Sequence, residues 1–442
     1  MLCVSMTKPL PVSVSDWPKA ILHIDGDSFF ASCEQAMHPE YKGKPLVVGG
    51  ERGIATAMSK EAKALGITRA MSNREVARRF PNCLIVSSDY ETYSMFSERM
   101  ISIIRRHTPT VEEYSIDECF ADITGLRKVK NQSYEEIAKT IKQELQSDLG
   151  ITFSAGLSVS KTMAKVATGW RKPNGFTAIK ARHIHHALQK LQVGDIWGIG
   201  PQTMARLEKL GVVNALAFAH KTEEWVQKHF DKPQLEIHRE LNGVAVKKIQ
   251  TEKRDPKSIS KTKTFSPPSD DYSYVFSQLS KNIENACIKA RRHDMYTDTV
   301  SIYLKTQQFD GFGRKLKLSV HTNSPQELLR VVESAFNDVF QQGTMYRTTG
   351  VRLSNLCYKK AYQPDLFNQH IQVEKLSGIY DVIDTIDRKF GKHSVYLASS
   401  MRAIIEGAYR GGRKTTAKRK QNLLDGENTR QRISIPYLGI VR

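Results

Sequence analysis

The sequence feature that most constrains the fold is a short apolar run that ends in acidic residues. Residues 20–24 (Ala-Ile-Leu-His-Ile) are followed directly by Asp25-Gly26-Asp27. A short apolar run of this length, ending at Asp25, is typical of a buried strand. Residues 111–122 predict a strand, a turn and a second strand, with Asp117 and Glu118 at the turn. Both acidic groups are therefore expected at the ends of strands.

Helical and strand patterns alternate through the first 180 residues. We expect a helix that begins at Ser28, with Ser28 as its N-cap, and two short strands within residues 45–58. The pattern further predicts helices over 59–65, 72–80, 89–107, 134–148 and from Ser160, with a strand over 152–159. Strands mixed with helices, one hairpin among them, predict an α+β or mixed α/β core.

The second half of the chain changes pattern twice. Residues 181–250 are expected to be all-helical, and residues 251–258 are charged, contain a proline and are interpreted as a linker. Residues 259–356 predict a second α+β unit, with strands over 300–305 and 315–321 and helices over 274–293 and 325–341. Beyond 357 we expect a short peptide, one helical stretch and a tail, of which 410–420 is dense in Arg, Lys and Gly.

Charge and cysteine usage limit the class of protein. The 66 Lys and Arg exceed the 46 Asp and Glu, which gives a formal net charge of +20 and indicates a polyanionic partner, with nucleic acid favoured. An anionic membrane surface and a basic surface without a partner remain alternatives, although we find no basic amphipathic helix and no membrane span. The six cysteines form no CxxC pair, which is typical of a reducing cytoplasm. The histidines His183, His185 and His186 have no zinc-finger spacing and are expected to be solvated.

The two acidic groups suit one kind of chemistry. Phosphoryl transfer from a nucleoside triphosphate needs two cations about 4 Å apart, and magnesium prefers oxygen ligands. Asp25-Gly26-Asp27 and Asp117-Glu118 could supply them. Taken alone, each group is a weak signal, because most such acidic pairs are turn residues that face water.

The context of both groups resembles the signatures of the Y family of DNA polymerases. The string Asp25-Gly26-Asp27-Ser28-Phe29-Phe30-Ala31-Ser32-Cys33-Glu34-Gln35 resembles the first signature, and Tyr114-Ser115-Ile116-Asp117-Glu118 resembles the second. The resemblance extends from about residue 20 to about residue 400 and lies near the bacterial DNA polymerase IV branch. Two strings, Glu112-Glu113-Tyr114 and Trp197-Gly198-Ile199-Gly200, are also similar to the catalytic subunit of polymerase V.

The resemblance implies a role for each acidic residue. Asp25 and Asp117 would bridge two Mg²⁺ ions, for which Mn²⁺ is a possible substitute, and Glu118 would complete the site where the primer 3′-hydroxyl is activated. The backbone carbonyl of Gly26, which replaces a larger apolar residue, would bind the metal that carries the nucleotide. Asp27 is not a ligand by this resemblance and is expected to cap the following helix.

The resemblance also implies a nucleotide site. Phe30 matches the steric gate that excludes a ribose 2′-hydroxyl, with a core position as its alternative; for its neighbour Phe29 the core position is favoured. Lys63 matches a basic residue that holds the triphosphate, and Lys60 stands where the family has a Tyr. For both lysines a solvated helix face is the alternative, and for Lys60 it has about even weight. Lys172, in Lys172-Pro173-Asn174-Gly175, would reach the triphosphate. The preceding helix, which contains Lys165, is expected to be mostly structural.

Contacts to DNA and to a sliding clamp follow from the same resemblance. Gly198 and Gly200 resemble the turn of a helix-hairpin-helix, which presents backbone N–H groups to a phosphate; a plain turn between helices is the alternative. Candidate contacts in the second α+β unit are Lys257, Lys261, Lys263, Arg291, Arg292 and Arg347. The peptide Gln363-Pro364-Asp365-Leu366-Phe367 resembles a clamp-binding motif, in which Gln363, Leu366 and Phe367 would fill pockets, and Pro364 replaces the usual Leu.

The resemblance therefore implies a multidomain α+β polymerase with the right-hand architecture. It is expected to act as a monomer in the cytoplasm and to have no membrane partner. Its substrates would be primer-template DNA and a dNTP, its partner the sliding clamp, and its role low-fidelity translesion synthesis. Its expected parts are a leader (1–18), a palm (19–28 and 89–179), fingers (29–88), a helical thumb (180–250), a linker (251–258), a little finger (259–356) and a C-terminal segment with the clamp peptide (357–442). The alternatives are a non-catalytic scaffold that binds DNA and the clamp, and a nucleotidyl cyclase.

Overall fold

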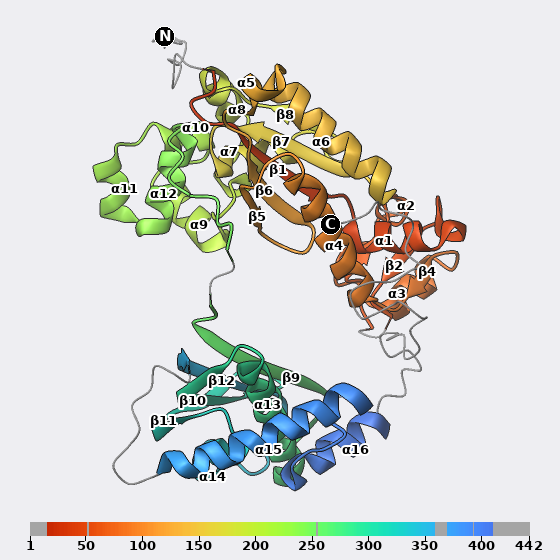
Figure 1. Ribbon diagram of the computed structural model, residues 1–442, viewed down its shortest axis with the longest axis vertical. Helices are drawn as coiled ribbons and strands as arrows, with labels where there is room; N and C mark the ends of the chain where they lie inside the picture. Colours follow the sequence, from red (N-terminus) through yellow and green to blue (C-terminus); the bar gives the residue numbers. More distant parts are fainter. Residues whose placement is uncertain (1–15, 51–52, 253–254, 359–368, 392, 410–442) are drawn as a thin grey trace. The chain divides into compact units, whose positions relative to one another are not determined.

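The computed structural model describes residues 16–50, 53–252, 255–358, 369–391 and 393–409 (Figure 1). The chain divides into two compact units, with the boundary between Lys253 and Arg254. Among the helices formed by these residues, none has the length and apolar composition needed to cross a membrane.

The first unit is built on a five-stranded sheet with the order β5-β6-β1-β7-β8. Its strands are β1 (Ile21–Gly26), β5 (Val111–Glu113), β6 (Glu118–Asp122), β7 (Phe153–Ser158) and β8 (Phe176–Ala178). The predicted first strand and the predicted hairpin are confirmed, and the structure pairs them antiparallel, next to each other. The short strand β8 was not predicted.

Alternation along β1 separates the two faces of this sheet. Leu22 and Ile24 face a core that is covered by α4 (Tyr90–Arg105) and α6 (Tyr134–Leu149). Ile21, His23 and Asp25 lie on the other face, where α7 (Lys161–Gly169) packs. Because side chains of a strand alternate between faces, His23 and Asp25 point to the same side. The predicted helices over 89–107, 134–148 and from Ser160 are confirmed.

A smaller three-stranded sheet follows, with the order β3-β2-β4. It consists of β2 (Leu46–Val48), β3 (Ala57–Met58) and β4 (Leu84–Val86), accompanied by α1 (Phe29–Met37), α2 (Lys60–Ala64) and α3 (Asn73–Arg79). The two strands predicted within 45–58 are confirmed. The parallel partner β4 was missed because three residues are too few for a pattern to show.

The rest of the first unit is helical, as predicted for residues 181–250. The helices here are α8 (Ile184–Gln189), α9 (Pro201–Lys209), α10 (Ala215–Ala219), α11 (Glu223–His229) and α12 (Lys232–Leu241), and the short helix α5 (Leu126–Lys130) lies earlier in the chain. The apolar side chains of α8 to α12 share one core with α7. The prediction that the three histidines of this region are solvated is wrong for His185, which is buried and stacks near His186.

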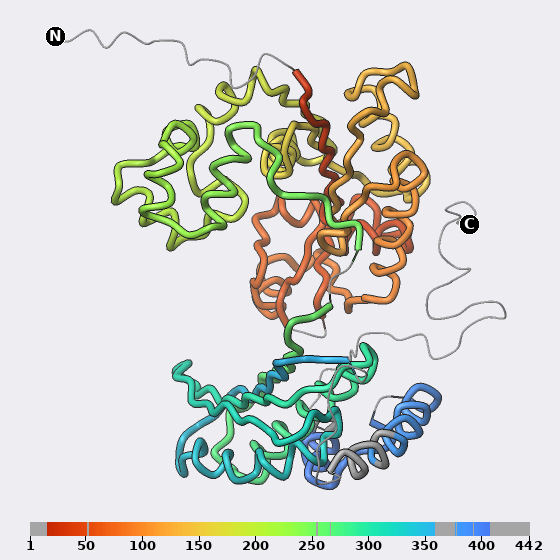
Figure 2. Tube along the Cα trace, turned by 60° about the vertical axis from the view of Figure 1, so that its left-hand side comes forward, coloured from red at the N-terminus to blue at the C-terminus, as the bar shows by residue number. Residues whose placement is uncertain are grey.

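The second unit, whose backbone is coloured from green to blue in Figure 2, contains a four-stranded antiparallel sheet with the order β11-β10-β12-β9. Its strands are β9 (Ser258–Ser269), β10 (Met295–Thr306), β11 (Gly311–Thr322) and β12 (Tyr346–Tyr358); its helices are α13 (Tyr272–Arg291), α14 (Pro325–Val339), α15 (Gln369–Phe390) and α16 (Met401–Tyr409). The two predicted strands and two predicted helices are confirmed. Strands β9 and β12 were not predicted, and the helical stretch expected beyond 357 consists of two helices.

Candidate active site

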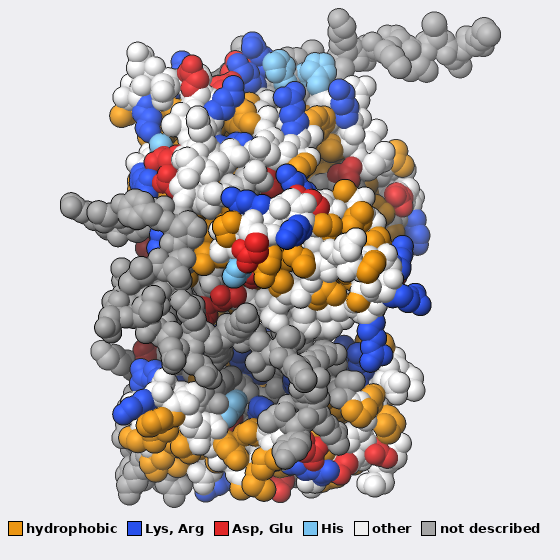
Figure 3. All heavy atoms as spheres, turned by 90° about the vertical axis from the view of Figure 1, so that its right-hand side faces the viewer, with side chains coloured by type: hydrophobic (Ala, Val, Ile, Leu, Met, Phe, Trp, Pro, Cys, Tyr) orange, Lys and Arg blue, Asp and Glu red, His pale blue; other side chains and the backbone are white. Residues whose placement is uncertain are grey.

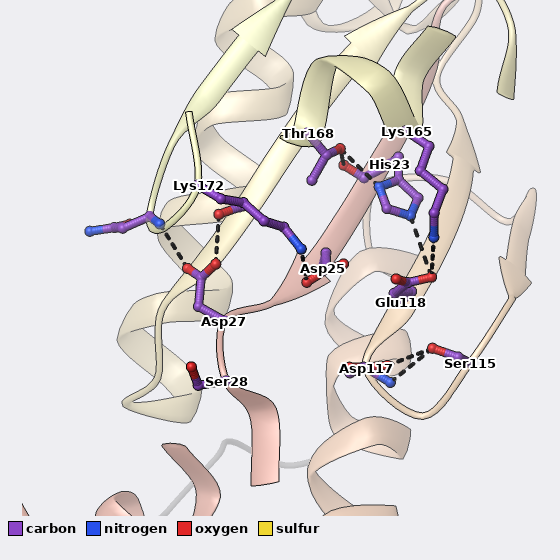
Figure 4. Close-up of polar contacts among 12 residues, drawn as sticks. His23, Asp25, Asp27, Ser28, Ser115, Asp117, Glu118, Lys165, Thr168 and Lys172 are labelled. Carbon is purple, nitrogen blue, oxygen red and sulfur yellow. Dashed lines mark hydrogen bonds and ion pairs between the residues drawn. The ribbon is translucent and has the colours of Figure 1, made fainter. Parts of the chain in front are cut away.

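Two of the candidate carboxylates face each other across neighbouring strands. Asp25 near the end of β1 is paired in register with Glu118 at the start of β6. Opposite residues of an antiparallel pair have their Cβ atoms about 5 Å apart, so the two carboxylates share one site. Figure 4 shows both side chains on the same side of the sheet, together with His23.

Asp117 lies beside this pair, but its side chain turns away from it. The backbone N–H of Gly26 donates to the carbonyl of Asp117 at 2.8 Å, which ties the hairpin turn to the end of β1. The Asp117 carboxylate accepts a hydrogen bond from Oγ of Ser115 at 2.6 Å. In the described part of the chain, no three His, Cys, Asp or Glu side chains converge as a metal-binding group. Asp25 and Glu118 nonetheless face each other with hard carboxylate oxygens, which is the donor chemistry that Mg²⁺ requires.

Two lysines are bound to the paired carboxylates. Nζ of Lys172 lies 2.5 Å from Oδ1 of Asp25, and Nζ of Lys165 lies 2.5 Å from Oε2 of Glu118. Burial raises the pKa of Asp25 to about 7, although Lys172 acts against that rise. Burial alone would also raise the pKa of Glu118, but the nearby His23 ring and the hydrogen-bonded ammonium group of Lys165 hold the pKa well below its usual range.

Sequence reasoning missed the roles of His23 and Lys165 at this site. Nδ1 of His23 is 2.8 Å from Oγ1 of Thr168 on α7, and its Nε2 is 3.9 Å from Glu118. Burial lowers the pKa of His23 to about 4. The two-residue spacing of His23 and Asp25 within a strand would have placed both on one face. A cavity of about 670 Å³ opens here, and its lining includes Asp25, Glu118, Lys165, Lys172 and Trp197.

Asp27 does not cap the helix that follows it, so that prediction is wrong. Its carboxylate accepts hydrogen bonds from Oγ of Ser154 at 2.7 Å and from the backbone N–H of Asn174 at 2.8 Å. Ser28 does occupy the N-cap position of α1, with a φ of +50°, but its side chain makes no capping bond. Asp27 therefore anchors the turn that carries Lys172 to the sheet.

The two phenylalanines of the first signature differ in their surroundings. Phe29 is buried in the core and its ring fills the space beside Gly26, where an added Cβ would lie 2.7 Å from Cδ2 of Phe29. The structure therefore places Phe29 in the core rather than in a nucleotide site. Phe30 is half-buried, and its ring stacks on Tyr93 with centroids 4.4 Å apart.

The two lysines of α2 also differ. Nζ of Lys63 donates to Oγ of Ser28 at 2.8 Å, which brings its charge to the start of α1. The side chain of Lys60 is 80% exposed, and its nearest charged partner is Glu61 at 3.9 Å. Both lysines thus lie near the start of α1, where Lys60 lines a pocket with Asp27 and Ser28, but only Lys63 makes a hydrogen bond there.

Comparison with known proteins decides the family. Residues 24–169 match the impB/mucB/samB family, and residues 256–366 match the C-terminal domain of that family. A DNA polymerase IV of Listeria monocytogenes serotype 4a is 30% identical over 348 residues, which cover 77% of this chain and 96% of that protein. A DNA polymerase IV of Streptococcus pyogenes serotype M3 is 28% identical over 354 residues, or 79% and 96% of the two chains. A solved Y-family DNA polymerase chimera of Dbh and Dpo4 superposes with a TM-score of 0.66 at 25% identity, covering 77% of this chain and all of that one.

The chain belongs to the Y family of DNA polymerases. The predicted family and the predicted α+β fold with a little finger are thereby confirmed.

The glycine loop of this Y-family polymerase precedes α9. Gly198 has a φ of +93°, and an added Cβ would lie 2.8 Å from Cδ1 of Ile237, so the loop needs glycine there. Gly200 has no atom within 4 Å of such a Cβ, and both glycines are exposed. The backbone at Gly198 and Gly200 is thus open to a ligand.

The basic residues of the second unit that were predicted to contact DNA differ in how far their charged groups are exposed to solvent. Lys263 and Arg292 are exposed and Lys261 is half-buried, whereas Arg291 is only 6% exposed and makes a bidentate ion pair with Asp384 on α15. The prediction that Arg291 contacts DNA is wrong, because its charge is neutralised inside the unit. Figure 3 shows other Lys and Arg side chains on the surface of both units. The clamp-binding candidates Gln363, Leu366 and Phe367 lie outside the described residues.

Proposed function

We propose that this chain extends a primer 3′ end by template-directed, two-metal phosphoryl transfer and is specialised for low-fidelity translesion synthesis. As a member of the family it is a DNA-directed DNA polymerase. The single observation that carries the two-metal proposal is the register of Asp25 with Glu118, beside a turn that hydrogen-bonds Asp117 to Gly26. That arrangement brings the carboxylates of Asp25 and Glu118 and the backbone of Asp117 to one end of the sheet.

Different residues of the site would bind the metal ions, bind the triphosphate and select the sugar. Asp25, Asp117, Glu118 and the carbonyl of Gly26 would hold two Mg²⁺ ions, or Mn²⁺ in their place. Such ions, when bound, activate the attacking hydroxyl and neutralise charge on the phosphates. Lys63 and Lys172 would bind the triphosphate, since both ammonium groups lie beside the β1–α1 segment. The Phe30 ring, held by Tyr93, would exclude a ribose 2′-hydroxyl.

Each polymerase subdomain corresponds to a sheet or a group of helices in the structure. We assign the palm to the five-stranded sheet, the fingers to residues 29–88, the thumb to the helices of 180–250 and the little finger to the second unit. In their described residues (29–50 and 53–88), the fingers contain three short strands, α-helices of five to nine residues and one three-residue 3₁₀ helix. Short fingers would make few contacts with the template base. This supports the proposal that the active site accepts damaged bases.

The remaining proposals concern partners and location. Exposed Lys263 and Arg292, half-buried Lys261 and the open backbone of Gly198 and Gly200 would contact phosphates of primer-template DNA. Residues 363–367 would dock on a sliding clamp. We further propose that the enzyme acts as a monomer in the cytoplasm.

Primer extension tests the proposal. Wild type should extend a primer on an undamaged template with Mg²⁺, and Asp117→Asn/Glu118→Gln should lose activity by at least about 1,000-fold. Asp122→Asn, a carboxamide at the far end of β6, is the matched control and should stay active. Activity in the double variant would refute the metal assignment. Inactive wild type with intact DNA binding would favour a scaffold or a missing partner.

A second template tests the specialisation. The same primer is extended on a template that carries an abasic site or a bulky base adduct, without and with the sliding clamp. Nucleotide insertion opposite at least one lesion is expected. A complete stop before every lesion, with normal extension elsewhere, would contradict the translesion role while leaving the polymerase activity intact.

A further inference from the structure

Two aromatic side chains join the catalytic turn to the glycine loop. Nε1 of Trp197 donates a hydrogen bond to Oη of Tyr114 at 3.1 Å, and the two rings meet edge to face with centroids 5.3 Å apart. Tyr114 precedes Asp117 by three residues, and Trp197 directly precedes Gly198. One side-chain contact therefore links a turn of the palm to a loop of the thumb.

On the palm side, Tyr114 is rigidly connected to Glu118. The backbone N–H groups of Tyr114 and Ser115 both donate to the carbonyl of Glu118, at 3.1 and 3.0 Å. The buried ring of Phe120 lies 5.6 Å from both aromatic rings and supports them from below. A shift of Tyr114 would therefore move Glu118 with it.

The same aromatic pair holds the cation that contacts Glu118. Nζ of Lys165 lies 4.9 Å from the ring centre of Tyr114 and 5.7 Å from that of Trp197, while it ion-pairs with Glu118. Nζ of Lys247 lies 4.3 Å from the ring centre of Trp197. Ammonium groups over aromatic faces are attracted by the ring electrons, so these contacts order Lys165 as well as the rings.

On the thumb side, the loop has little freedom. Ile199 is buried in the thumb core, and Gly198 is closely packed against Ile237 of α12. The loop is thus fixed to α12 on one side and, through Trp197, to the catalytic turn on the other. The backbone that is open at Gly198 and Gly200 is held at a set distance from Glu118.

We propose that Tyr114 and Trp197 are positioning residues that set where the primer 3′ end lies relative to Asp117 and Glu118. The proposal rests on the proposed function, in which the glycine loop binds the primer backbone and the turn holds the reacting end. Neither residue touches the reacting atoms; the pair acts by fixing the distance between the two parts. Displacement of a reacting group by about 1 Å can cost about 100-fold in rate, so a loosened pair should slow chemistry without weakening DNA binding.

The test uses Tyr114→Phe, Trp197→Phe and the double variant of the full chain. Tyr114→Phe keeps the ring and removes the hydrogen-bond acceptor; Trp197→Phe removes the donor and half of the ring system. Trp225→Phe is the matched control, because Trp225 is another half-buried thumb tryptophan with a lysine over its ring. Single-turnover nucleotide addition gives the maximal rate and the dNTP affinity. Fluorescence of 2-aminopurine at the primer 3′ end, measured without metal and without dNTP, reports the order of the terminus.

We expect the maximal rate to fall about 10-fold for Trp197→Phe, with dNTP and DNA affinities within about twofold of wild type. The double variant should be no slower than Trp197→Phe, because removal of either partner breaks the same contact. The 2-aminopurine signal should differ from wild type in both single variants and not in Trp225→Phe. Additive losses, an unchanged rate, or losses that follow thermal stability would overturn the proposal.

Failure of the positioning proposal can be distinguished from failure of the proposed polymerase function. If wild type adds no nucleotide, the polymerase proposal fails, yet the primer-end fluorescence still tests the pair. An unchanged signal in Trp197→Phe would then overturn the positioning role. If Trp197→Phe does not fold, Tyr114→Phe, which removes one oxygen from an exposed ring, carries the same test.

Discussion

The ring of Phe30 lies parallel to the ring of Tyr93, with centroids 4.4 Å apart and planes inclined by 15°. Tyr93 is fully buried, and its hydroxyl donates a hydrogen bond to Oε1 of Glu34 at 2.5 Å. Core packing and this hydrogen bond together hold the Tyr93 ring in place. Tyr90 contacts Phe30 edge to face at 5.6 Å. The ring of the candidate sugar gate is therefore packed against two tyrosine rings.

Replacement of Phe30 should open the sugar site. Phe30→Ala is expected to raise ribonucleotide incorporation relative to deoxyribonucleotide by at least about 10-fold, because nothing would then meet the 2′-hydroxyl. Tyr93→Leu should have a smaller effect of the same sign, and Tyr93→Phe, which keeps the supporting ring, should have none on sugar choice. Competition between rCTP and dCTP on one template measures the ratio. Unchanged sugar selection in Phe30→Ala would refute the gate.

The two lysines of α2 should differ in their effect on nucleotide binding. Lys63→Ala is expected to raise the KM for dNTP about 10-fold, because a charge-assisted bond to phosphate would be lost. Lys60→Ala should raise it by less than about twofold, since that ammonium group faces solvent. Steady-state kinetics with one dNTP measures both, and each variant serves as control for the other. The reverse order would mean that Lys60 occupies the triphosphate site.

Loss of the Arg291–Asp384 pair should destabilise the second unit. Arg291→Met leaves the Asp384 carboxylate partly buried and without its bidentate partner, which should cost about 3 kcal/mol. All four tryptophans of the chain (Trp17, Trp170, Trp197 and Trp225) precede residue 254 and report only the first unit. Far-UV circular dichroism should therefore show an earlier urea transition while tryptophan fluorescence stays unchanged.

The neighbouring Arg292 provides the control for that experiment. Arg292→Met removes an exposed charge from the same helix end and should leave the transition in place. For DNA affinity the order of the two variants should be the opposite. Arg292→Met should weaken DNA binding more than Arg291→Met does, provided both are folded. Equal stability of the two variants would contradict the buried pair as a stabilising contact.

Deletion of residues 363–367 tests the clamp peptide. Basal primer extension should be unaffected, and stimulation by the sliding clamp should be lost, because Gln363, Leu366 and Phe367 would no longer fill pockets on the clamp. A variant with Leu366→Ala and Phe367→Ala, which keeps the chain length, should behave in the same way. Equal loss of basal and stimulated synthesis would instead indicate damage to the fold.

Much of the site was predictable because its residues follow local patterns. The apolar run before Asp25 and the hairpin around Asp117 and Glu118 are short-range features, and the sequence placed both acidic groups at strand ends. The pairing of β1 with β6, which sets Asp25 opposite Glu118, was not predicted and comes from the tertiary structure. What could not be predicted was which side chains join them: Lys165 lies 47 residues from Glu118 in the chain, and Thr168 lies 145 residues from His23.

The sequence by itself determined the strands and helices with strong periodicity, the family resemblance and the positions of the acidic residues. Only the tertiary structure showed that Asp27 binds Ser154 and Asn174, 127 and 147 residues away, rather than its own helix. It also removed Arg291 from the DNA-binding candidates, since its partner Asp384 is 93 residues distant. Local periodicity fixes a helix or strand because it depends on neighbouring residues, whereas the partner of a buried charge depends on which distant segments the fold brings together.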